Sequence, residues 1–579
     1  ASCVYACPVN CIHPTPDEPE FLTAEMLHID PAACVDCGAC VSACPVDAIV
    51  PEKKLAESQQ VFLQINADYY KNEDLSRAKI GGTDRRPALA KFKAAPEVNR
   101  DREPLRVAII GSGPAAMYAA DELLTQPDVK VNVFDRLPVP HGLVRAGVAP
   151  DHQKTKQVSK LYEVIAAQSG FEYYLGVEIG KHLSHDELLD HHHAVIYAVG
   201  ASSDRKLGID GENLPGSTSA TNFVAWYNGH PDHANDVFDL SQKRVVIIGN
   251  GNVALDVARI LTADPDRLAE SDISTQALNA LRASKVEEVV VVARRGFAQS
   301  AFTVPEFAGL LEAPNIDVVV DSDEAQLDPQ TQSLVDSGQL PHSVEQKLRQ
   351  LEQVRERPAP ITGRKRIVFR YLMSPTKIVG TENVTGVEFV RNEFVTDSDG
   401  SVRVTPTDAN EVVPTGLVLT SIGYRGVPIE GVPFDDTAGI IPNDDGRVLD
   451  SPGGSITPSA YVTGWIKRGP TGFIGTNKSC AQKTVNHLVD DFNAGLLSTP
   501  RRGDRDLDRL VQQRGAEVID RAGWRVIDEA ERARGVRNGR VREKITDVAE
   551  LQAVASTVSR APARPTRKMP TLVGLVGRK

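Results

Sequence analysis

Long hydrophobic runs are missing from this chain of 579 residues, and so is an excess of positive charge. A helix that crosses a bilayer needs about 18 or more consecutive apolar residues, and because no such run occurs we expect no membrane span. The start of the sequence also lacks the basic region of a secretory signal peptide. Since 77 acidic residues outweigh 65 basic ones, giving a net charge of -12, we expect no nucleic-acid partner. Together these absences favour a cytoplasmic protein.

Cysteine is nearly absent after residue 44. Seven of the eight cysteines lie in the first 44 residues, and the eighth is Cys480. A disulfide framework is disfavoured because seven is an odd number and the expected compartment is reducing. A structural zinc site usually takes two separated cysteine pairs, and this spacing does not provide them. The clustered thiols therefore indicate a different metal chemistry.

The spacing of the clustered cysteines is that of a bacterial iron–sulfur run. The main run reads Cys34-x2-Cys37-x2-Cys40-x3-Cys44-Pro45. Three thiolates at three-residue steps can hold three corners of one cluster, while the fourth, before proline, reaches a second cluster. The end of another such run, Cys3-x3-Cys7-Pro8, precedes it. The sequence therefore predicts an iron–sulfur domain over residues 1–70.

Charge and composition suggest how this domain is attached. Residues 1–70 carry ten acidic residues and two lysines, a net charge of 2 - 10 = -8, so we expect docking on a basic surface. Residues 71–104 are rich in Lys, Arg, Ala and Pro without apolar periodicity, and we interpret them as a flexible linker. At roughly 150 residues per domain, the remaining length accommodates two or three more domains.

Two later segments each combine a buried strand, a glycine-rich turn and a helix. In the first, the strand over residues 106–110 leads into Gly111-Ser112-Gly113-Pro114-Ala115-Ala116. Gly111 permits a tight turn and Gly113 lets the backbone approach a pyrophosphate at the helix N-terminus. Asp135 ends the next strand, where a carboxylate binds ribose hydroxyls and repels a 2′-phosphate. This site is expected to bind FAD or NAD.

The second segment differs at the end of its second strand. The strand over residues 244–248 leads into Gly249-Asn250-Gly251-Asn252-Val253-Ala254. Where the first unit has an acid, this unit has Arg294 and Arg295, which suit a phosphate dianion and favour NADP(H) over NAD(H). A flavin site followed by an NADPH site describes a flavin reductase. A redox dithiol is excluded because only Cys480 lies outside the iron–sulfur segment, so the iron–sulfur domain is the expected acceptor.

At this point the chain resembles a known family, adrenodoxin-reductase-type NADPH–ferredoxin reductases with a fused N-terminal ferredoxin domain. The resemblance covers about residues 1–490 and rests on residues 107–116, the stretch GLVRAGVAPDH at 142–152 and the stretch GWIKRGPTG at 464–472. It implies an α/β fold: a ferredoxin-like iron–sulfur domain, two Rossmann-type domains and a helical C-terminal extension. The boundaries we expect are 1–70, 71–104 (linker), 105–203 with 415–494 (FAD), 204–414 (NADPH) and 495–579 (extension with a loose basic tail).

The resemblance also implies site residues. FAD contacts are expected from Gly111, Gly113, Ala115, Asp135, Leu143, Val177, Trp465, Gly472, Phe473 and Ile474. NADPH contacts are expected from Arg205, Asn250, Gly251, Asn252, Val253, Arg294, Arg295 and Glu306. His152 beside the flavin and Glu306 are the expected catalytic residues. Members of the family often carry a second glutamate where this chain has Gly309, which weakens a two-carboxylate proton relay.

Similarity to seven-iron ferredoxins implies how the thiols are divided. By that resemblance a [4Fe-4S] cluster is held by Cys7, Cys34, Cys37 and Cys40. A [3Fe-4S] cluster is held by Cys3, Cys44 and a ligand upstream of Ala1. Because the sequence starts with Ala rather than Met, we expect that a natural N-terminal piece precedes it. Cys11 has no ligand role in that pattern and is expected to be a small buried residue.

The function expected from these features is NADPH–ferredoxin oxidoreduction, with a hydride passed from NADPH to FAD and single electrons passed to the clusters and an external acceptor, a ferredoxin or a ferredoxin-dependent enzyme. One alternative is an iron–sulfur redox sensor or docking module on a flavoprotein. Another is the electron-input subunit of a larger synthase. The run His191-His192-His193 is not expected to bind metal, because consecutive side chains diverge, and we interpret it as a solvated loop.

Overall fold

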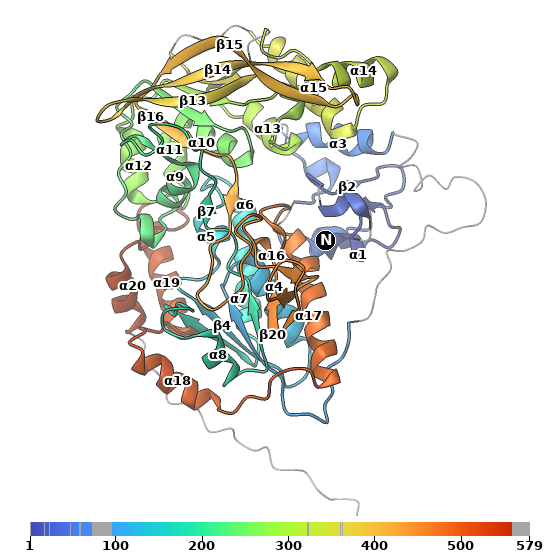
Figure 1. The fold of residues 1–579 in the computed structure, drawn as a ribbon, viewed down its shortest axis with the longest axis vertical. Coiled ribbons are helices and arrows are strands. Elements are labelled where there is room, and N and C mark those ends of the chain that lie inside the picture. Colours follow the sequence, from blue (N-terminus) through green and yellow to red (C-terminus); the bar gives the residue numbers. More distant parts are fainter. Residues whose placement is uncertain are drawn as a thin grey trace, which may run out of the picture.

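The computed structural model describes residues 2–16, 18–22, 24–46, 48–56, 59–71, 95–320, 323–358, 360–361 and 363–557. Two α/β domains are stacked along the long axis, and the N-terminal module, blue in Figure 1, lies at the side of the stack. The last three helices, in red, lie on the opposite side of the lower domain (Figure 1). Within the described ranges no helix combines the length and the apolar character that crossing a bilayer requires.

The N-terminal module is a small unit of short elements. They are α1 Ser2–Ala6, β1 Ile12–His13, η1 Pro19–Leu22, β2 His28–Ile29, α2 Ala39–Ala43, η2 Glu52–Lys54 and α3 Val61–Tyr69. β1 and β2 pair antiparallel, with Ile12 opposite Ile29. The core consists of Val4, Cys7, Cys11 and Ile12. So small a core contributes little stability by itself, and a unit of this size usually depends on bound metal or on its neighbours.

The first Rossmann domain, the lower one in Figure 1, is built on a seven-stranded sheet of order β18-β19-β20-β6-β3-β4-β5. Its strands are β3 Arg106–Ile110, β4 Lys130–Asp135, β5 Phe171–Leu175, β6 Ala194–Tyr197, β18 Asn443–Asp444, β19 Arg447–Leu449 and β20 Ile456–Val462. β3 pairs parallel with β4 and β6. Val107 and Ile109 enter the core on one face, and Ala108 and Ile110 the core on the other. Burial on both faces explains the continuous apolar run.

Helices cover both faces of this sheet. They are α4 Pro114–Leu124, α5 Leu143–Ala146, α6 Gln153–Lys156, α7 Val158–Ala166, α8 His185–Leu189, α16 Trp465–Arg468 and α17 Thr476–Ala494. α4 and α17 pack closely against each other. β20, α16 and α17 come from the far end of the chain, and β20 pairs parallel with β6 of this sheet.

The second Rossmann domain has a parallel six-stranded sheet of order β11-β12-β10-β9-β16-β8. Its strands are β8 Ser217–Ser219, β9 Arg244–Ile248, β10 Glu288–Val292, β11 Ile316–Val320, β12 Lys365–Arg370 and β16 Leu417–Thr420. Because β16 lies between β9 and β8, the chain leaves this domain after Thr420, and the boundary expected at residue 415 is corrected. The short pair β7 Ser203–Asp204 and β17 Tyr424–Arg425 marks the two crossings between domains.

Helices and a second sheet complete this domain. The helices are α9 Ala220–Tyr227, α10 Asn252–Thr262, α11 Pro265–Leu268, α12 Thr275–Arg282, α13 Val304–Leu311, α14 Pro329–Ser337 and α15 His342–Arg355, with the 3-10 turns η5 Pro231–His233 and η6 Phe297–Gln299. The antiparallel sheet β13 Met373–Gly380, β14 Val384–Thr396 and β15 Val402–Pro414 covers the end of the domain farthest from the first one (Figure 1). The helices α13 and α15 lie on the side that faces the N-terminal module (Figure 1).

The C-terminal extension is helical, as expected, and is part of the first domain. Its helices are α18 Asp504–Gln513, α19 Arg521–Arg537 and α20 Val548–Ala555. Trp524, Ile527 and Leu551 are fully buried in the core that contains Val107. The predicted loose basic tail, from residue 558, lies outside the described residues.

Two expectations about loops need correction or restriction. Residues 72–94 of the predicted linker lie outside the described residues. In the rest of it, Val98 is buried and the N–H of Asn99 donates to the side chain of Asn493 at 2.8 Å. Residues 95–104 therefore belong to the first domain. His191, His192 and His193 are buried rather than solvated. His191 contacts the carbonyl oxygen of Gly503 at 3.2 Å, His192 contacts Asn132 at 3.0 Å, and the His193 ring lies 5.3 Å from that of Phe492.

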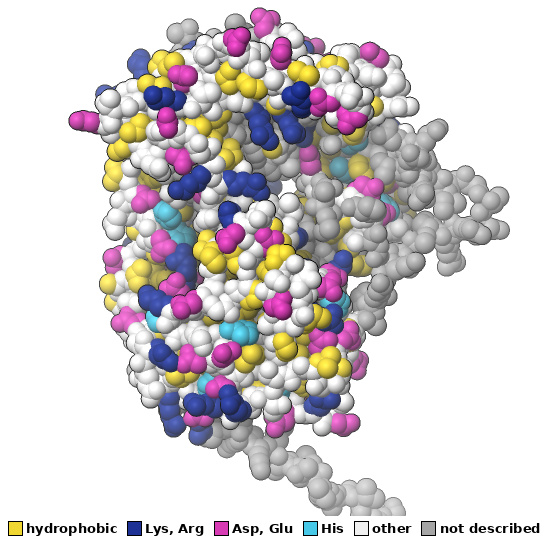
Figure 2. Space-filling view, in the orientation of Figure 1, with side chains coloured by type: hydrophobic (Ala, Val, Ile, Leu, Met, Phe, Trp, Pro, Cys, Tyr) yellow, Lys and Arg dark blue, Asp and Glu magenta, His cyan; other side chains and the backbone are white. Residues whose placement is uncertain are grey.

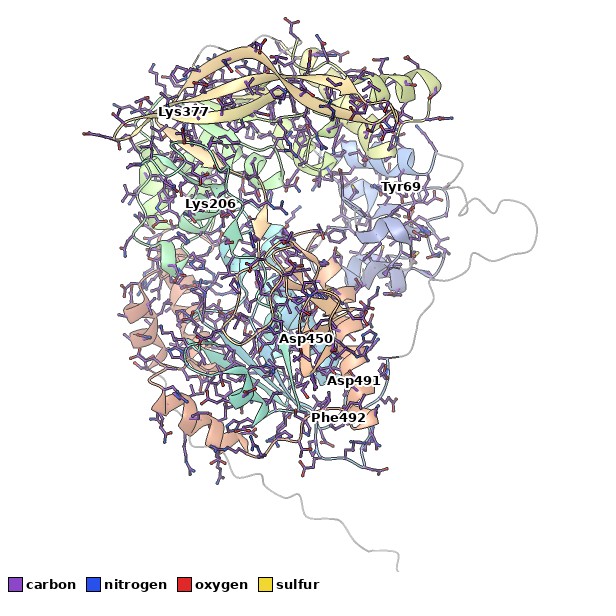
Figure 3. All side chains as sticks on the ribbon, in the orientation of Figure 1. Tyr69, Lys206, Lys377, Asp450, Asp491 and Phe492 are labelled. Atoms are coloured by element: carbon purple, nitrogen blue, oxygen red, sulfur yellow. The ribbon has the colours of Figure 1, made fainter. Side chains whose placement is uncertain are left out.

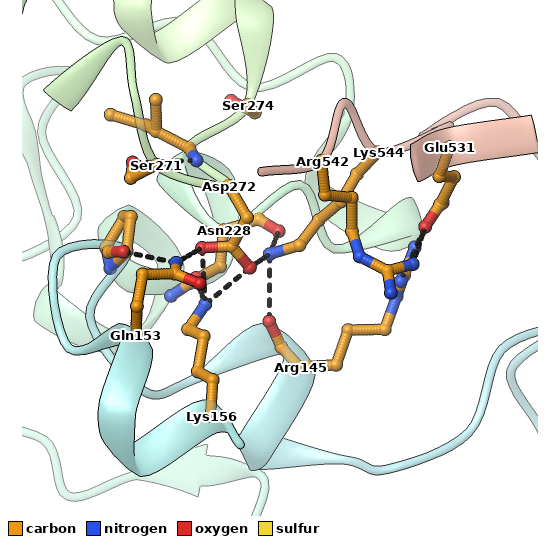
Figure 4. Close-up of polar contacts among 12 residues, drawn as sticks. Arg145, Gln153, Lys156, Asn228, Ser271, Asp272, Ser274, Glu531, Arg542 and Lys544 are labelled. Atoms are coloured by element: carbon orange, nitrogen blue, oxygen red, sulfur yellow. Dashed lines mark hydrogen bonds and ion pairs between the residues drawn. The ribbon is translucent and has the colours of Figure 1, made fainter. Parts of the chain in front are cut away.

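A buried charge network joins both Rossmann domains and the extension (Figure 4). The carboxylate of Asp272, from the second domain, pairs with Lys156 of the first at 2.8 Å and with Lys544 of the extension at 2.9 Å. Lys544 also donates to the carbonyl oxygen of Arg145, whose guanidinium pairs with buried Glu531 at 2.6 Å. Burial lowers the pKa of both lysines, whereas the two ammonium groups, against the effect of burial, lower the pKa of Asp272. We call this network the three-way joint.

Candidate dinucleotide, flavin and iron–sulfur sites

The first glycine-rich turn lies between β3 and α4. Gly111 has a φ of 101°, and a Cβ placed on it would lie 2.5 Å from the carbonyl oxygen of Ala198. Only glycine fits there. α4 begins directly after Gly113, with Pro114 at its first position, so its free N–H groups form the kind of helix N-terminus that binds a pyrophosphate.

Three sequence motifs meet at this turn. A Cβ on Gly142 would lie 3.1 Å from the Cα of Gly113, and a Cβ on Gly464 would lie 2.6 Å from the Cβ of Ala115. The stretches 142–152 and 464–472 therefore contact the glycine-rich turn through bare backbone. Close backbone approach of this kind leaves room for a large planar ligand, and these residues fit FAD.

Asp135 ends β4 beside the same turn. Its carboxylate accepts hydrogen bonds from the Ser112 N–H at 2.9 Å, from the Ser112 hydroxyl at 2.5 Å and from the Leu137 N–H at 2.9 Å. Burial raises the pKa of Asp135, and these hydrogen bonds oppose the shift. Asp135 thus orders the turn in addition to the ribose contact expected of it. The N–H of Val177 donates to its carbonyl oxygen at 2.9 Å, which places a further expected FAD residue next to it.

The remaining expected flavin residues lie on α5 and around α16. Leu143 is 38% exposed although apolar. Trp465 donates from Nε1 to the carbonyl oxygen of Thr471 at 3.1 Å, and its ring lies 5.5 Å from that of Tyr424. Gly472 has a φ of 79°, and Phe473 and Ile474 follow it half-buried. These are the surfaces expected to line the flavin ring.

The second glycine-rich turn lies between β9 and α10. A Cβ on Gly249 would lie 2.0 Å from the carbonyl oxygen of Ser421, whereas a Cβ on Gly251 would meet nothing within 4 Å. The turn is therefore tight at its start and open where a ligand would lie. The Oδ1 of Asn250 accepts from the Ala301 N–H at 3.3 Å, and that of Asn252 from the Thr303 N–H at 2.8 Å.

Exposed basic side chains surround this turn. Arg294 and Arg295 follow β10, and both are exposed; within the described part of the chain neither guanidinium takes part in an ion pair. Arg205, also exposed, follows β7, and its N–H donates to the Gly423 carbonyl oxygen at 3.0 Å. Lys and Arg side chains gather on this part of the face in Figure 2, and Figure 3 shows Lys206 at the same edge of the second domain. The available positive charge fits NADP(H).

The two expected catalytic residues lie together between the domains. Ligand atoms of His152, Asp256 and Glu306 are all within 4.8 Å of one another. The guanidinium of Arg259 donates to the His152 Nε2 at 2.9 Å and also pairs with Asp256 and Asp151. Because arginine is always a donor, His152 Nε2 is the acceptor. In the neutral imidazole the single N–H is therefore on Nδ1. We call these four groups, with Asp151, the His152 cluster.

Asp256 and Arg259 were missed by the sequence reasoning. The signal was available, because Asn252, Asp256 and Arg259 are spaced i, i+4, i+7 and share one face of α10. Burial and then the neighbouring Glu306 carboxylate raise the pKa of Asp256 well above its usual range, and burial lowers the pKa of Arg259 to about 10. Burial and the Glu306 carboxylate therefore favour the protonated form of Asp256.

The clustered cysteines lie close together within the module. Cys40 lies within electrostatic reach of Cys34, Cys37 and Cys3, and burial, followed by the Cys34 thiol, raises its pKa. Cys7 is buried, and Cys3, Cys34 and Cys40 pack against the core that contains it. Cys3 also lies within electrostatic reach of Cys44. Thiols gathered in this way fit an iron–sulfur site. Gly38, with a φ of 73°, turns the loop that carries Cys37 into α2.

Cys11 is buried next to this group, as expected. Its N–H donates to the sulfur of Cys7 at 3.3 Å, an interaction that would stabilise a thiolate ligand. Its own sulfur lies 3.3 Å from that of Cys7. Cys37, in contrast, is exposed on the outer loop.

Comparison with known families agrees with this geometry. Residues 105–319 match the family of pyridine nucleotide-disulphide oxidoreductases, and residues 1–48 match the 4Fe-4S dicluster domain. FAD, NADP and an iron–sulfur cluster are thus the cofactors of this chain, since the two glycine-rich turns fit the nucleotides and the clustered cysteines fit the cluster.

Similar proteins cover nearly all of the chain. A probable ferredoxin/ferredoxin–NADP reductase of Mycobacterium tuberculosis is 55% identical over 566 residues, which are 97% of this chain and 94% of that protein. The NADPH-ferredoxin reductase FprA of the same organism is 45% identical and covers 77% of this chain and 98% of its own length. Its solved structure in complex with NADPH matches with a TM-score of 0.73 and 43% identity, over 78% of this chain and 100% of that one. The chain therefore belongs to the ferredoxin–NADP reductases of the adrenodoxin-reductase type that carry an N-terminal iron–sulfur domain.

Proposed function

We propose that this chain is an FAD-dependent NADPH–ferredoxin oxidoreductase that passes electrons to its own iron–sulfur module and from there to an external redox partner. The observation that carries the proposal is the position of the His152 cluster between two glycine-rich turns, with the module adjacent. Bound FAD supplies the conversion of a two-electron donor to one-electron acceptors, which iron–sulfur clusters require. Everything else is positioning and electrostatics supplied by the residues below.

The binding residues set which nucleotide lies where. Asp135 and the bare backbone at Gly111, Gly142 and Gly464 favour an unphosphorylated adenosine ribose at the first turn. Arg294 and Arg295 provide two exposed guanidinium groups at the second, and neither forms an ion pair with another described residue. The difference in charge between the two strand ends supports FAD in the first domain and NADPH in the second.

The His152 cluster holds a proton next to the expected flavin position. Arg259 fixes the His152 ring through Nε2, leaving Nδ1–H to donate. Asp256 takes over the place of the second carboxylate that Gly309 does not supply, because it lies within 4.8 Å of Glu306. This arrangement restores a carboxylate pair from a different helix.

We assign Cys7, Cys34, Cys37 and Cys40 to a [4Fe-4S] cluster, and Cys3 and Cys44 to a [3Fe-4S] cluster whose third ligand would precede Ala1. The exposed loop around Cys37 supports contact with an external partner. We place the protein in the cytoplasm.

Stopped-flow spectroscopy of the holoenzyme tests the function. NADPH should bleach the flavin and then the iron–sulfur absorbance within one turnover. A flavin that is reduced while the module stays oxidised would favour a redox sensor, and reduction only in the presence of a second subunit would favour a synthase component. Iron quantification with EPR before and after dithionite, for wild type and Cys37→Ser, counts the clusters. Full iron content in Cys37→Ser would refute the ligand set.

A further inference from the structure

The iron–sulfur module touches the wall of the nucleotide site as well as the flavin domain. Residues 300–304 run from the end of η6 into the first residue of α13, and α13 carries Glu306 in its first turn. On one side Asn250 and Asn252 of the nucleotide turn hold this segment, through the Ala301 and Thr303 N–H groups. The other side of the segment faces α15 and the module. We call residues 300–304 the wall segment.

The module reaches the wall segment through one carboxylate. Glu25 Oε2 accepts a hydrogen bond from the Val304 N–H at 2.7 Å, and Oε1 pairs with Lys347 at 3.1 Å. Lys347 is 9% exposed and donates in turn to the Ser300 carbonyl oxygen at 3.1 Å. Glu25 therefore contacts the wall segment directly at one end and through Lys347 at the other.

The start of α13 depends on this contact. Its N-cap residue, Thr303, makes no side-chain cap of its own, because its hydroxyl accepts from the Asn252 amide at 3.2 Å instead. Pro305, the second residue of the helix, has no N–H to be capped. Glu25 supplies the missing acceptor for the Val304 N–H, and its negative charge suits the positive end of the helix dipole.

Other contacts hold the module in the position that this requires. Asp68 of α3 is 2% exposed and pairs with Arg349 of α15, and it accepts from Gln346 at 3.0 Å. Ser2 contacts Lys478 of α17 at 3.3 Å. Acids on the module meet bases on α15, so docking brings Glu25 to α13 in one defined orientation.

We propose that Glu25 is a positioning residue that couples docking of the iron–sulfur module to NADPH binding. The proposal rests on the assignment of the second turn to NADPH. With Glu25 in place, the wall segment keeps the hydrogen bonds between Thr303 and Asn252. The first turn of α13, which carries Glu306, is then held in its position beside the nucleotide turn. Coupling is reciprocal, so the nucleotide strengthens docking by the factor by which docking strengthens nucleotide binding.

The test uses the full-length holoenzyme with Glu25→Gln and Glu25→Ala, and Glu52→Ala as a control at an exposed acid of the same module. NADP+ affinity is measured by flavin absorbance titration, and flavin reduction at saturating NADPH by stopped flow. We expect the NADP+ dissociation constant to rise about five- to tenfold in Glu25→Ala, as loss of a charged cap would give, and less in Glu25→Gln. The iron and flavin contents of the Glu25 variants should match wild type. The NADP+ dissociation constant of Glu52→Ala should also match wild type.

Hydrogen exchange gives a readout that a purely structural role would not move. In wild type, NADP+ should raise protection of the α3 amides, and in Glu25→Ala this response should vanish. An unchanged NADP+ dissociation constant in Glu25→Ala would overturn the coupling. So would α3 amide protection that does not change when NADP+ is added to wild type. Failure of NADPH to reduce wild-type flavin would instead refute the proposed function.

Discussion

At the scale of single residues, glycine positions define where cofactors can lie. Gly111, Gly249 and Gly464 each have a positive φ, and each stands where a Cβ would collide with a backbone or side-chain atom. These positions were predictable where a glycine follows an apolar strand, since the turn is local. Gly464 could be placed only through the resemblance, because its neighbour Ala115 lies far away in sequence.

Gly464→Ala should impair flavin retention. The added Cβ would lie 2.6 Å from Ala115, and overpacking of this kind costs about 1–3 kcal/mol. We expect a lower flavin-to-protein ratio after gel filtration with little loss of iron. The matched control is Gly503→Ala, where a Cβ meets nothing within 4 Å. Equal flavin content in both variants would show that the three motifs do not share one crevice.

Arg294 and Arg295 should determine nucleotide preference. Changing both to Gln removes charge-assisted contacts worth about 1.5–3 kcal/mol each, so the KM for NADPH should rise by about tenfold or more. The KM for NADH should change by less than about twofold, because NADH has no 2′-phosphate. Steady-state kinetics with both nucleotides check this, and parallel increases would contradict the assignment.

At the scale of elements, sequence periodicity located the strands and helices but not what packs over them. The runs at 106–110 and 244–248 are strands because they alternate between two buried faces of a sheet. The burial of His191 and His193 could not be predicted, since their partners Gly503 and Phe492 lie about 300 residues away in sequence and carry no local signal. For the same reason β16 was assigned to the wrong domain.

The contact between α3 and α15 should weaken in acid. The ring of His28 stacks on Tyr69 at 4.0 Å and meets the ring of His342 at 5.9 Å, and Figure 3 shows Tyr69 on the part of the module next to α15. Burial, then His342, lowers the pKa of His28 to about 3, and burial lowers that of His342 despite Glu345 and Asp68, with Arg349 also nearby.

The sign of the pH effect follows from these shifts. His28 and His342 bind fewer protons when the module is docked on α15 than when it is undocked. The docked state is therefore fully stable above about pH 6.5 and loses stability as the pH falls toward 3. Between pH 7.5 and 5.5 we expect about 1.4 kcal/mol of loss for His28, or about tenfold lower hydrogen-exchange protection of α3. A His28→Phe, His342→Phe variant should show a flatter pH profile. Protection that is independent of pH in wild type would refute the role of these rings.

At the scale of the whole molecule, the three-way joint fixes the angle between the Rossmann domains. Asp272 forms ion pairs with the buried ammonium groups of Lys156 and Lys544. The substitution Asp272→Asn therefore removes the carboxylate that both ammonium groups pair with. We expect a loss of about 3–5 kcal/mol in unfolding free energy, and a smaller loss for Lys544→Met, because Lys156 then still pairs with Asp272.

Thermal and denaturant unfolding of the holoenzyme measure this order of effects. Asp266→Asn is the control, because its carboxylate is 85% exposed and its pair with Arg282 should contribute less than about 1 kcal/mol. If Lys544→Met were more damaging than Asp272→Asn, the uncompensated charge would not be the main cost. The stopped-flow rate of flavin reduction would show whether a loosened joint also slows the hydride step.

The discontinuity of the first domain has a consequence for biosynthesis. β3, β4, β5 and β6 leave the ribosome early, but β20, which pairs with β6, and α19 and α20, which complete the core around Trp524, are made last. The second domain, whose strands all lie between residues 217 and 420, can fold while the first is still half-formed. During translation the half-sheet exposes its β6 edge and its apolar faces, a state prone to aggregation. Flavin can be captured only near the end of synthesis, so cofactor supply and chaperone protection at that stage would control the yield of active enzyme.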